Sequence, residues 1–229
     1  MKKLRSILNL IAIIALFVVG LTLIFIKPIQ ALLVQRLSEE LVTVSTYSEI
    51  LELNDEIEAD FDFEEVQSLS IWEVLQAQTN RKDLPVIGSI GIPSVNMHLP
   101  ILKGVGKNAL AVGAGTMKPK QIMGQGNYAL AAHYFEDRDI LFGPLYRSAI
   151  GDAIFLTHAD AIYEYQITKI EVVEATAVHV IEDVANETLL TLITCADEGV
   201  RRLLVQASFV QEYNIDSPPD ALQQTTQEK

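Results

Sequence analysis

The stretch TLLTLITCADEGVRRLLVQASF, from Thr188 to Phe209, decides the fold and carries the most informative residues of the chain. Its apolar runs predict two strands, over residues 189–194 and 203–210. A hairpin between them returns Arg201 and Arg202, where the second strand begins, to the side of Cys195, where the first strand ends. Because groups at strand ends project over the rim of a sheet, a thiol and a guanidinium are expected together at such a rim.

Short apolar runs separated by Gly, Pro and Asn also occur upstream, as far as Leu84. They predict six more strands, over residues 86–92, 99–102, 128–132, 153–156, 162–168 and 170–173. A short helix is expected around residues 109–111 and a turn near residues 142–147. Eight short strands separated by turn signals indicate an all-β barrel or sandwich. The sequence contains no GxGxxG or phosphate-binding loop pattern, which leaves a nucleotide cofactor without support.

An uncharged, apolar run from Ser6 to Ile26 matches the roughly 20 residues that a helix needs to cross a bilayer. Lys2, Lys3 and Arg5 precede it, so the positive-inside rule predicts a cytoplasmic tail at residues 1–5 and an extracellular domain after the anchor. A cleaved signal peptide is the alternative, but signal peptides have a shorter apolar stretch and a small-residue cleavage motif. We therefore expect an uncleaved transmembrane anchor at residues 6–26.

Residues 27–83 form an acidic segment in which leucines recur at helical spacing, and the apolar residues between positions 63 and 75 predict a second amphipathic helix. We expect a helical linker that packs loosely on the domain. Its acidic polar positions argue against binding to a membrane surface. The main domain is expected at residues 84–213, followed by a polar, disordered tail at residues 214–229.

The chain has one cysteine, Cys195, which excludes an internal disulfide. The segment NYALAAHYFEDRDILFGPL places His133 at the end of another predicted strand, where a polar loop opens. A thiol, an imidazole and a guanidinium are the nucleophile, the proton carrier and the oxyanion partner that cysteine acyl transfer requires. The alternative for Cys195 is a buried small hydrophobic residue. No orienting partner of His133 is identified, although Asp137 and Asp139 lie nearby in the sequence.

These segments resemble those of a known family. LITC followed closely by an arginine resembles the TLxTC…R signature of sortases, and AAHYF resembles their histidine segment. The stretches IGSIGIPSVNMHLPILKGVG, AVGAGTMKPKQIMGQGNYALAAHYF and LFGPLYRSAIGDAIFLT are similar to class A (housekeeping) sortases of the streptococcal and lactobacillal type. The resemblance covers the chain from about Leu84 to Glu212 and implies a closed β-barrel of about eight strands with short helices.

The resemblance implies a membrane-tethered cysteine transpeptidase of a Gram-positive bacterium, which cleaves an LPxTG-type sorting signal between Thr and Gly. Cys195 would attack the Thr carbonyl and form a thioacyl enzyme, which an amine of the cell-wall precursor lipid II would resolve. His133 would protonate the departing amine and deprotonate the incoming one. Arg202 would donate hydrogen bonds to the oxyanion or the peptide backbone, because RLLV aligns with the family pattern. Side chains alternate along a strand, so Arg201 would face the other way.

The resemblance further implies a substrate pocket for the Leu and Pro of the signal, lined by Ala131, Val178, Val180, Ile181, Ile193 and Thr194. Ordinary β-core is the alternative for each of these residues. We expect no metal, because ligand spacings such as C-x-x-C or H-x-x-x-H do not occur. Some class A sortases use calcium held by an acidic cluster, but the corresponding segment TMKPKQIMGQG carries Lys118 and Lys120.

Three other functions stay open from the residues alone. A class C, pilin-polymerising sortase usually carries an Asp-Pro-aromatic lid motif and a second, C-terminal membrane helix, which this sequence lacks. A hydrolytic cysteine peptidase would use the same Cys195 and His133. A membrane-anchored binding module would leave the matched cysteine, histidine and arginine unexplained. The expected partners are LPxTG-bearing surface proteins and lipid II, and the net charge of -13 argues against nucleic acid.

Overall fold

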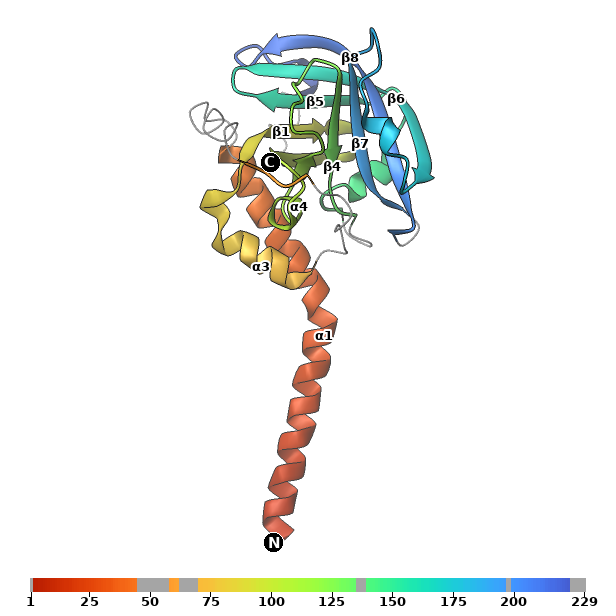
Figure 1. Ribbon diagram of the computed structural model, residues 1–229. Coiled ribbons are helices and arrows are strands. Elements are labelled where there is room, and N and C mark those ends of the chain that lie inside the picture. The colour runs from red at the N-terminus through yellow and green to blue at the C-terminus, as the bar shows by residue number, and fades with distance from the viewer. Residues whose placement is uncertain (1, 45–57, 62–69, 135–138, 197–198, 223–229) are drawn as a thin grey trace.

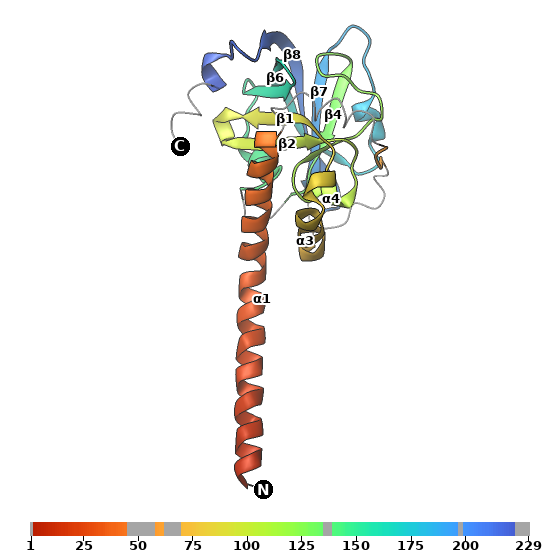
Figure 2. The same cartoon turned by 90° about the vertical axis from the view of Figure 1, so that its left-hand side faces the viewer.

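The structure is a computed structural model that describes residues 2–44, 58–61, 70–134, 139–196 and 199–222. One long helix, α1 (Lys2–Val44), leads into a β-barrel that forms the body of the molecule (Figures 1 and 2). The first part of α1 stands clear of the barrel, whereas its second part lies against it. The most apolar stretch of α1 has a mean hydropathy of 2.8 and is not buried, so by length and composition it is able to cross a membrane.

Eight strands close into one barrel in the order β1-β2-β3-β4-β7-β8-β6-β5, which confirms the predicted closed all-β fold. Neighbouring strands are antiparallel except for the parallel pairs β2–β3 and β4–β7. The strands are β1 (Val86–Ile92), β2 (Met97–Leu102), β3 (Ala114–Thr116), β4 (Asn127–Ala131), β5 (Ala153–His158), β6 (Ala161–Glu174), β7 (Leu189–Ala196) and β8 (Arg201–Asn214).

Among the described residues, one short helix directly precedes β1, and four more lie between strands. They are η1 (Arg81–Asp83), η2 (Pro93–Val95), α4 (Lys107–Leu110), η3 (Gly143–Arg147) and η4 (Val178–Ile181). The helix predicted near residues 109–111 corresponds to α4, and the turn predicted near residues 142–147 corresponds to η3. The predicted tail begins where β8 ends, and the structure describes it as far as Leu222.

Two of the strand predictions were wrong in detail. Residues 162–168 and 170–173, expected as separate strands, belong to the single strand β6, whose pairing with β8 shifts register between Ile167 and Lys169. Such a bulge interrupts the alternation of side chains without ending the strand. The sequence did not predict β3, because Ala-Gly-Thr has little strand propensity of its own. Its pairing with β2 and β4 makes it a strand.

The described α-helices of the segment that follows the apolar run, the second part of α1 and a second helix, α3 (Ile71–Thr79), pack on the folded core, more tightly than the loosely packed linker that we expected. In α1, Val34, Leu37 and Leu41 are at most 5 % exposed. Leu37 and Leu41 share one apolar cluster with Leu102 of β2 and with Ala77 of α3. Val34 joins the main core of the barrel. The helix predicted from the spacing of these leucines is present as part of α1. Its apolar face packs tightly against the barrel and α3.

The helix α3 begins with a capping box. Ser70 Oγ accepts the N–H of Glu73 at 3.3 Å, and Glu73 Oε2 accepts the N–H of Ser70 at 2.9 Å. The sequence predicts that this helix begins near residue 63, and residues 62–69 lie outside the described part of the chain. Val74, which follows Glu73 in α3, is fully buried in the core of the barrel. The helix α3 therefore packs tightly against the barrel.

Candidate active site

The candidate active site forms where two parallel strands end side by side. β4 and β7 pair with Ala131 opposite Ile193, and the N–H of Ala132 donates to the carbonyl of Ile193 at 3.3 Å. His133 lies two residues beyond Ala131, and Cys195 lies two residues beyond Ile193. His133 therefore lies just beyond the end of β4, Cys195 lies near the end of the neighbouring β7, and the two residues line the same cavity.

The strand β8 adds an arginine beside the cysteine. β7 and β8 form the expected antiparallel hairpin, in which Cys195 lies directly opposite Arg202 and Ala196 lies opposite Arg201. Directly opposite residues share one face of a sheet, so Cys195 and Arg202 point the same way and Arg201 points the other way. Arg202 Nη1 donates to the carbonyls of Gly199 at 2.7 Å and Arg201 at 3.1 Å, which holds the guanidinium over the hairpin turn.

His133, Cys195 and Arg202 line one cavity of about 630 Å³. Every residue predicted for the substrate pocket lines the same cavity: Ala131, Val178, Val180, Ile181, Ile193 and Thr194. The sequence did not single out Leu110, Met117 and Val173, which also line it. The structure therefore brings the predicted residues together around one space, and their individual roles remain predictions.

The walls of this cavity are apolar and its rim is open. Ile181 and Ile193 pack against a buried cluster that includes Leu110, Met117 and Ala131. At the rim, Val178 is 71 % exposed, which leaves a large apolar side chain ready to be covered by a ligand. Concave, mostly apolar surfaces with a few converging polar groups are typical of binding sites, and here those groups are the thiol, imidazole and guanidinium.

The environment of His133 sets its protonation state. The side chain is only 6 % exposed, and this burial lowers the pKa of the imidazole from its ordinary 6.5. The negative charge of Glu73, at the start of α3, acts in the opposite direction. At pH 7 the imidazole is therefore mainly neutral and able to accept a proton. Of the two carboxylates considered as its orienting partner, Asp139 pairs with Arg147, and Asp137 lies outside the described residues.

Tyr146, in η3, contacts the site and was not indicated by the sequence. Its hydroxyl donates to the backbone carbonyl of Cys195 at 2.9 Å. Its ring packs on Tyr134, with the two centroids 4.8 Å apart. Since Tyr134 directly follows His133, the aromatic pair ties the backbone beside the imidazole to the backbone of the nucleophile. This contact depends on the path of the loop before β5, for which the sequence carries no signal.

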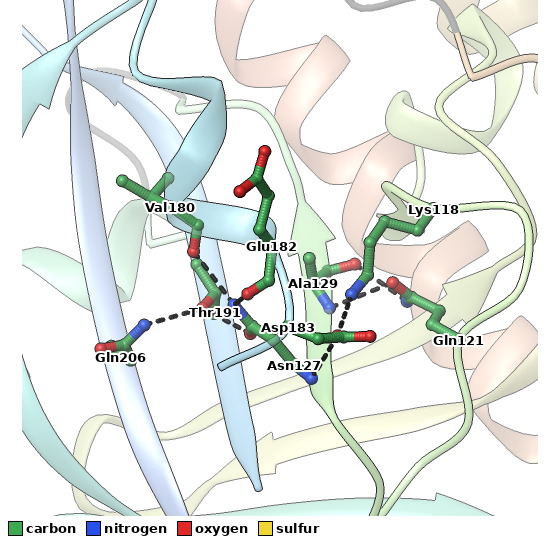
Figure 3. Close-up of polar contacts among 9 residues, drawn as sticks. All are labelled: Lys118, Gln121, Asn127, Ala129, Val180, Glu182, Asp183, Thr191 and Gln206. Carbon is green, nitrogen blue, oxygen red and sulfur yellow. Dashed lines mark hydrogen bonds and ion pairs between the residues drawn. The ribbon is translucent and has the colours of Figure 1, made fainter. Parts of the chain in front are cut away.

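A buried asparagine fastens the loop that walls the cavity (Figure 3). Asn127, the first residue of β4, is 1 % exposed, and its Nδ2 donates to the carbonyls of Val180 and Glu182, both at 3.0 Å. Its Oδ1 accepts a hydrogen bond from Thr191 Oγ1 of β7 at 2.7 Å. One side chain therefore joins the loop around η4 to β4 and β7, the two parallel strands that lead to His133 and Cys195.

Asp183 strengthens this attachment. Its Oδ1 accepts the N–H of Asn127 at 2.8 Å and forms an ion pair with Lys118 Nζ at 2.7 Å (Figure 3). The contact with Lys118, followed by that with Asn127, lowers the pKa of Asp183 from its ordinary value. Gly126 has a φ of +55°, and a Cβ there would lie 2.8 Å from the Asp183 carboxylate, so both backbone and space require glycine. Lys118 thus supplies a positive charge to the pocket loop.

Comparison with known proteins identifies the family. A family model described as the sortase domain matches residues 90–210. The chain belongs to the sortase family. It is 39 % identical over 217 residues to Sortase A of Streptococcus agalactiae, covering 91 % of this chain and 88 % of that protein. It is also 39 % identical over 182 residues to Sortase A of Listeria monocytogenes, covering 80 % and 82 % of the two chains.

Solved sortase structures agree with this assignment. A crystal structure of sortase A from Listeria monocytogenes superposes with a TM-score of 0.55 at 36 % identity, covering 57 % of this chain and 90 % of that one. Sortase C-3 of Streptococcus pneumoniae, at 20 % identity and a TM-score of 0.60, shares the fold. The sortase resemblance predicted from LITC and AAHYF is confirmed. This sortase is a cysteine transpeptidase, and its apolar α1 is consistent with a membrane anchor.

Proposed function

We propose that this sortase cleaves an LPxTG-type sorting signal between Thr and Gly and joins the Thr carboxyl group to an amine of lipid II. The product would be a surface protein ready for incorporation into the cell wall. The observation that supports this most is the position of His133 just beyond the end of β4, of Cys195 on β7 and of Arg202 on β8, all lining one cavity. The similarity to Sortase A proteins over most of the chain supports the same substrate class.

The first step is acylation of the cysteine. The Cys195 thiol gives its proton to the neutral imidazole of His133, and Sγ attacks the carbonyl carbon of the Thr residue. Arg202 donates a hydrogen bond to the oxygen that becomes negative. When the C–N bond to Gly breaks, the departing amine takes the proton from His133, and a thioester remains on Cys195.

The second step is transfer to the acceptor amine. The amine attacks the thioester carbon, the C–S bond breaks, and the amine proton passes through His133 to the thiolate of Cys195. One amide bond is exchanged for another, so the reaction needs no added energy source. Water competes with the amine at this step, and the balance between them separates a transpeptidase from a hydrolase.

The cavity wall accounts for the apolar part of the signal. Val178, Val180 and Ile181 stand on the loop that Asn127 holds, and Ala131 and Ile193 form the floor beside the catalytic residues. Their small and apolar side chains suit the Leu and Pro of the motif. Covering the exposed Val178 would contribute about 1.5–3 kcal/mol if the whole side chain became buried, an upper limit for one contact.

The test is incubation of the full chain in detergent with an LPxTG peptide, with and without triglycine, followed by mass spectrometry. We expect a product in which the Thr carboxyl group is joined to triglycine. The Cys195→Ala variant should keep the circular dichroism spectrum and give no product. Full activity of this variant would overturn the proposal, because no other thiol exists in the chain.

The same assay distinguishes the alternatives. A hydrolytic peptidase would release the free acid even at saturating triglycine. A binding module would retain the peptide without cleaving it. A class C, pilin-polymerising enzyme would prefer an amine on a pilin subunit to triglycine.

We further propose that α1 spans the cell membrane with residues 1–5 in the cytoplasm and the barrel outside. The basic residues Lys2, Lys3 and Arg5 before the apolar run support this orientation. Protease added to intact cells should digest the barrel and leave the N-terminus intact. Protection of the barrel until the cells are lysed would contradict the proposed orientation.

A further inference from the structure

The helix α3 turns an uncharged face to solvent. Trp72 and Leu75 are 76 % and 41 % exposed, and Gln76 and Thr79 are exposed on the same face at helical spacing. Trp is the residue that proteins favour where an apolar environment meets water, because its ring is apolar and its N–H is polar. Trp72 is the only tryptophan of a chain whose net charge is -13. An exposed Trp and Leu on an uncharged face of so acidic a protein indicate a surface that contacts something other than bulk water.

The position of α3 indicates what that surface meets. In both views α3 lies at the end of the barrel from which the free part of α1 extends (Figures 1 and 2). α3 is fixed to α1 by packing of Ala77 in one cluster with Leu37, and η1 adds an ion pair between Arg81 and Glu40 at 3.1 Å. The exposed face of α3 therefore keeps a constant position relative to the predicted membrane span.

The distance along α1 places this end of the barrel close to the bilayer. Among the side chains of α1 whose exposure the structure describes, Gln30 is the first that is buried, four residues beyond the predicted end of the span at Ile26. At a rise of about 1.5 Å per residue this is about 6 Å. The headgroup layer on each side of a bilayer is about 5–7 Å thick. Ile29 and Leu32, 52 % and 48 % exposed, add apolar side chains on α1 at the same level.

We infer that the exposed face of α3 rests in the headgroup layer of the membrane that α1 spans, with Trp72 as an interfacial anchor. The linker as a whole is acidic, which argued against membrane contact, but Glu73, the one acidic residue of α3, is turned to Ser70 in the capping box. Contacts through both α1 and α3 fix the tilt of the barrel as well as its height. The inference rests on membrane anchoring by α1 and is independent of the peptide chemistry.

The single tryptophan makes a direct test possible. The full chain is placed in lipid nanodiscs whose phospholipids carry bromine either near the headgroup or near the end of the acyl chain. Bromine quenches indole fluorescence only at short range. We expect strong quenching of Trp72 by bromine near the headgroup and weaker quenching by bromine deep in the bilayer.

The matched control moves the indole to the far end of the barrel. In the double variant Trp72→Phe/Val210→Trp, the indole stands at a 48 % exposed position near the C-terminal end of β8. This part of β8 lies at the end of the barrel away from α3 (Figures 1 and 2). Its emission should be the same with and without bromine.

Equal emission of wild type with and without bromine, in protein that stays in the nanodiscs, would overturn the inference. So would equal quenching of wild type and control, because another face would then touch the lipid. Protein that fails to stay in the nanodiscs would overturn the anchor itself, whereas loss of peptide transfer alone would leave the quenching unchanged.

Discussion

Among single residues, the two neighbouring arginines test the proposed chemistry most sharply. Arg202→Ala should lower turnover about a hundredfold or more, the usual scale for losing one oxyanion donor. Arg202→Lys should restore only part of it, because an ammonium lacks the planar fork of donors. Arg201→Ala should stay near wild type, since this residue lies opposite Ala196 and faces away from Cys195. The measurement is kcat and KM for transfer of an LPxTG peptide to triglycine.

Arg202 also bonds to the carbonyl of Gly199, so the structural effect of its loss needs a separate measurement. In urea denaturation, Arg202→Ala should lower the free energy of unfolding by at most about 3 kcal/mol, the upper end of the range for a hydrogen bond to a charged group. An inactive Arg201 variant beside an active Arg202 variant would contradict the strand register. If both arginine variants lowered turnover only slightly and to the same extent, backbone N–H groups and not an arginine would stabilise the oxyanion.

The pH dependence of the reaction should report the surroundings of His133. Burial lowers the imidazole pKa from 6.5 and Glu73 raises it, so the acid limb of kcat/KM should fall below pH 6.5. In Glu73→Gln the imidazolium loses a favourable charge, its pKa falls further, and the acid limb should move to lower pH. Glutamine keeps an acceptor for the N–H of Ser70, so the capping box is retained.

Glu212→Gln serves as the control for this shift, because Glu212 lies on β8 and acts on Tyr163. Its profile should coincide with that of wild type. An acid limb that stays in place in Glu73→Gln, or that moves to higher pH, would show that the charge of Glu73 does not act on the imidazole of His133.

The residues that we propose as catalytic were predictable from the sequence, because their chemistry and their positions at the ends of strands single them out. Cys195, His133 and Arg202 stand at strand ends, and the pairing of three strands brings them together as expected. Tyr146 and Glu73 were not predictable, because each reaches the site through the docking of a separate segment. Neither strand periodicity nor a short motif encodes such docking.

Among the elements, the pocket loop around η4 carries the clearest prediction. Lys118→Met should raise KM for the peptide up to about fivefold and leave kcat nearly unchanged, because a solvent-exposed ion pair contributes at most about 1 kcal/mol. Lys120→Met, in the same segment but at an exposed position, should leave KM unchanged. A fall in kcat at constant KM in Lys118→Met would show that the ion pair acts on the chemistry and not on the pocket.

Asn127→Ala should have a larger effect of the same kind. It leaves the carbonyls of Val180 and Glu182 and the hydroxyl of Thr191 without their partner, and a lost buried hydrogen bond costs about 1–3 kcal/mol. Here too we expect a higher KM. A normal KM in this variant would mean that the loop keeps its place without the asparagine.

A strand could be predicted where its own sequence carries the pattern of apolar residues that is typical of strands. β1, β7 and β8 fall close to their expected ranges. β3 could not be predicted, because its neighbours impose the extended conformation on Ala-Gly-Thr. Likewise, the hydrogen bonds of Asn127 to the loop join segments more than 50 residues apart, and no local pattern carries that information.

For the molecule as a whole, the packing of α1 predicts a stability effect. In a chain that starts at Lys27, Leu37→Ala should lower the free energy of unfolding by about 2–5 kcal/mol, because it leaves a cavity in a fully buried cluster. Leu32→Ala on the exposed side of the same helix should stay within about 0.5 kcal/mol of wild type. Urea denaturation followed by circular dichroism measures both. Equal, small effects would show that α1 only touches the barrel.

The place of β7 between β4 and β8 bears on how the enzyme is made. The contact of Thr194 with Ala132 joins residues 62 positions apart, and the partner of Cys195 on β8 comes later still. The ribosome synthesises the chain from its N-terminus, and pairing between distant segments forms slowly. Before β8 has been synthesised and paired, the cysteine has no arginine beside it and the barrel is open. We therefore expect the nascent chain to be inactive during its synthesis, and to become able to cut and join peptides only when β8 pairs with β7 and β6 and closes the barrel.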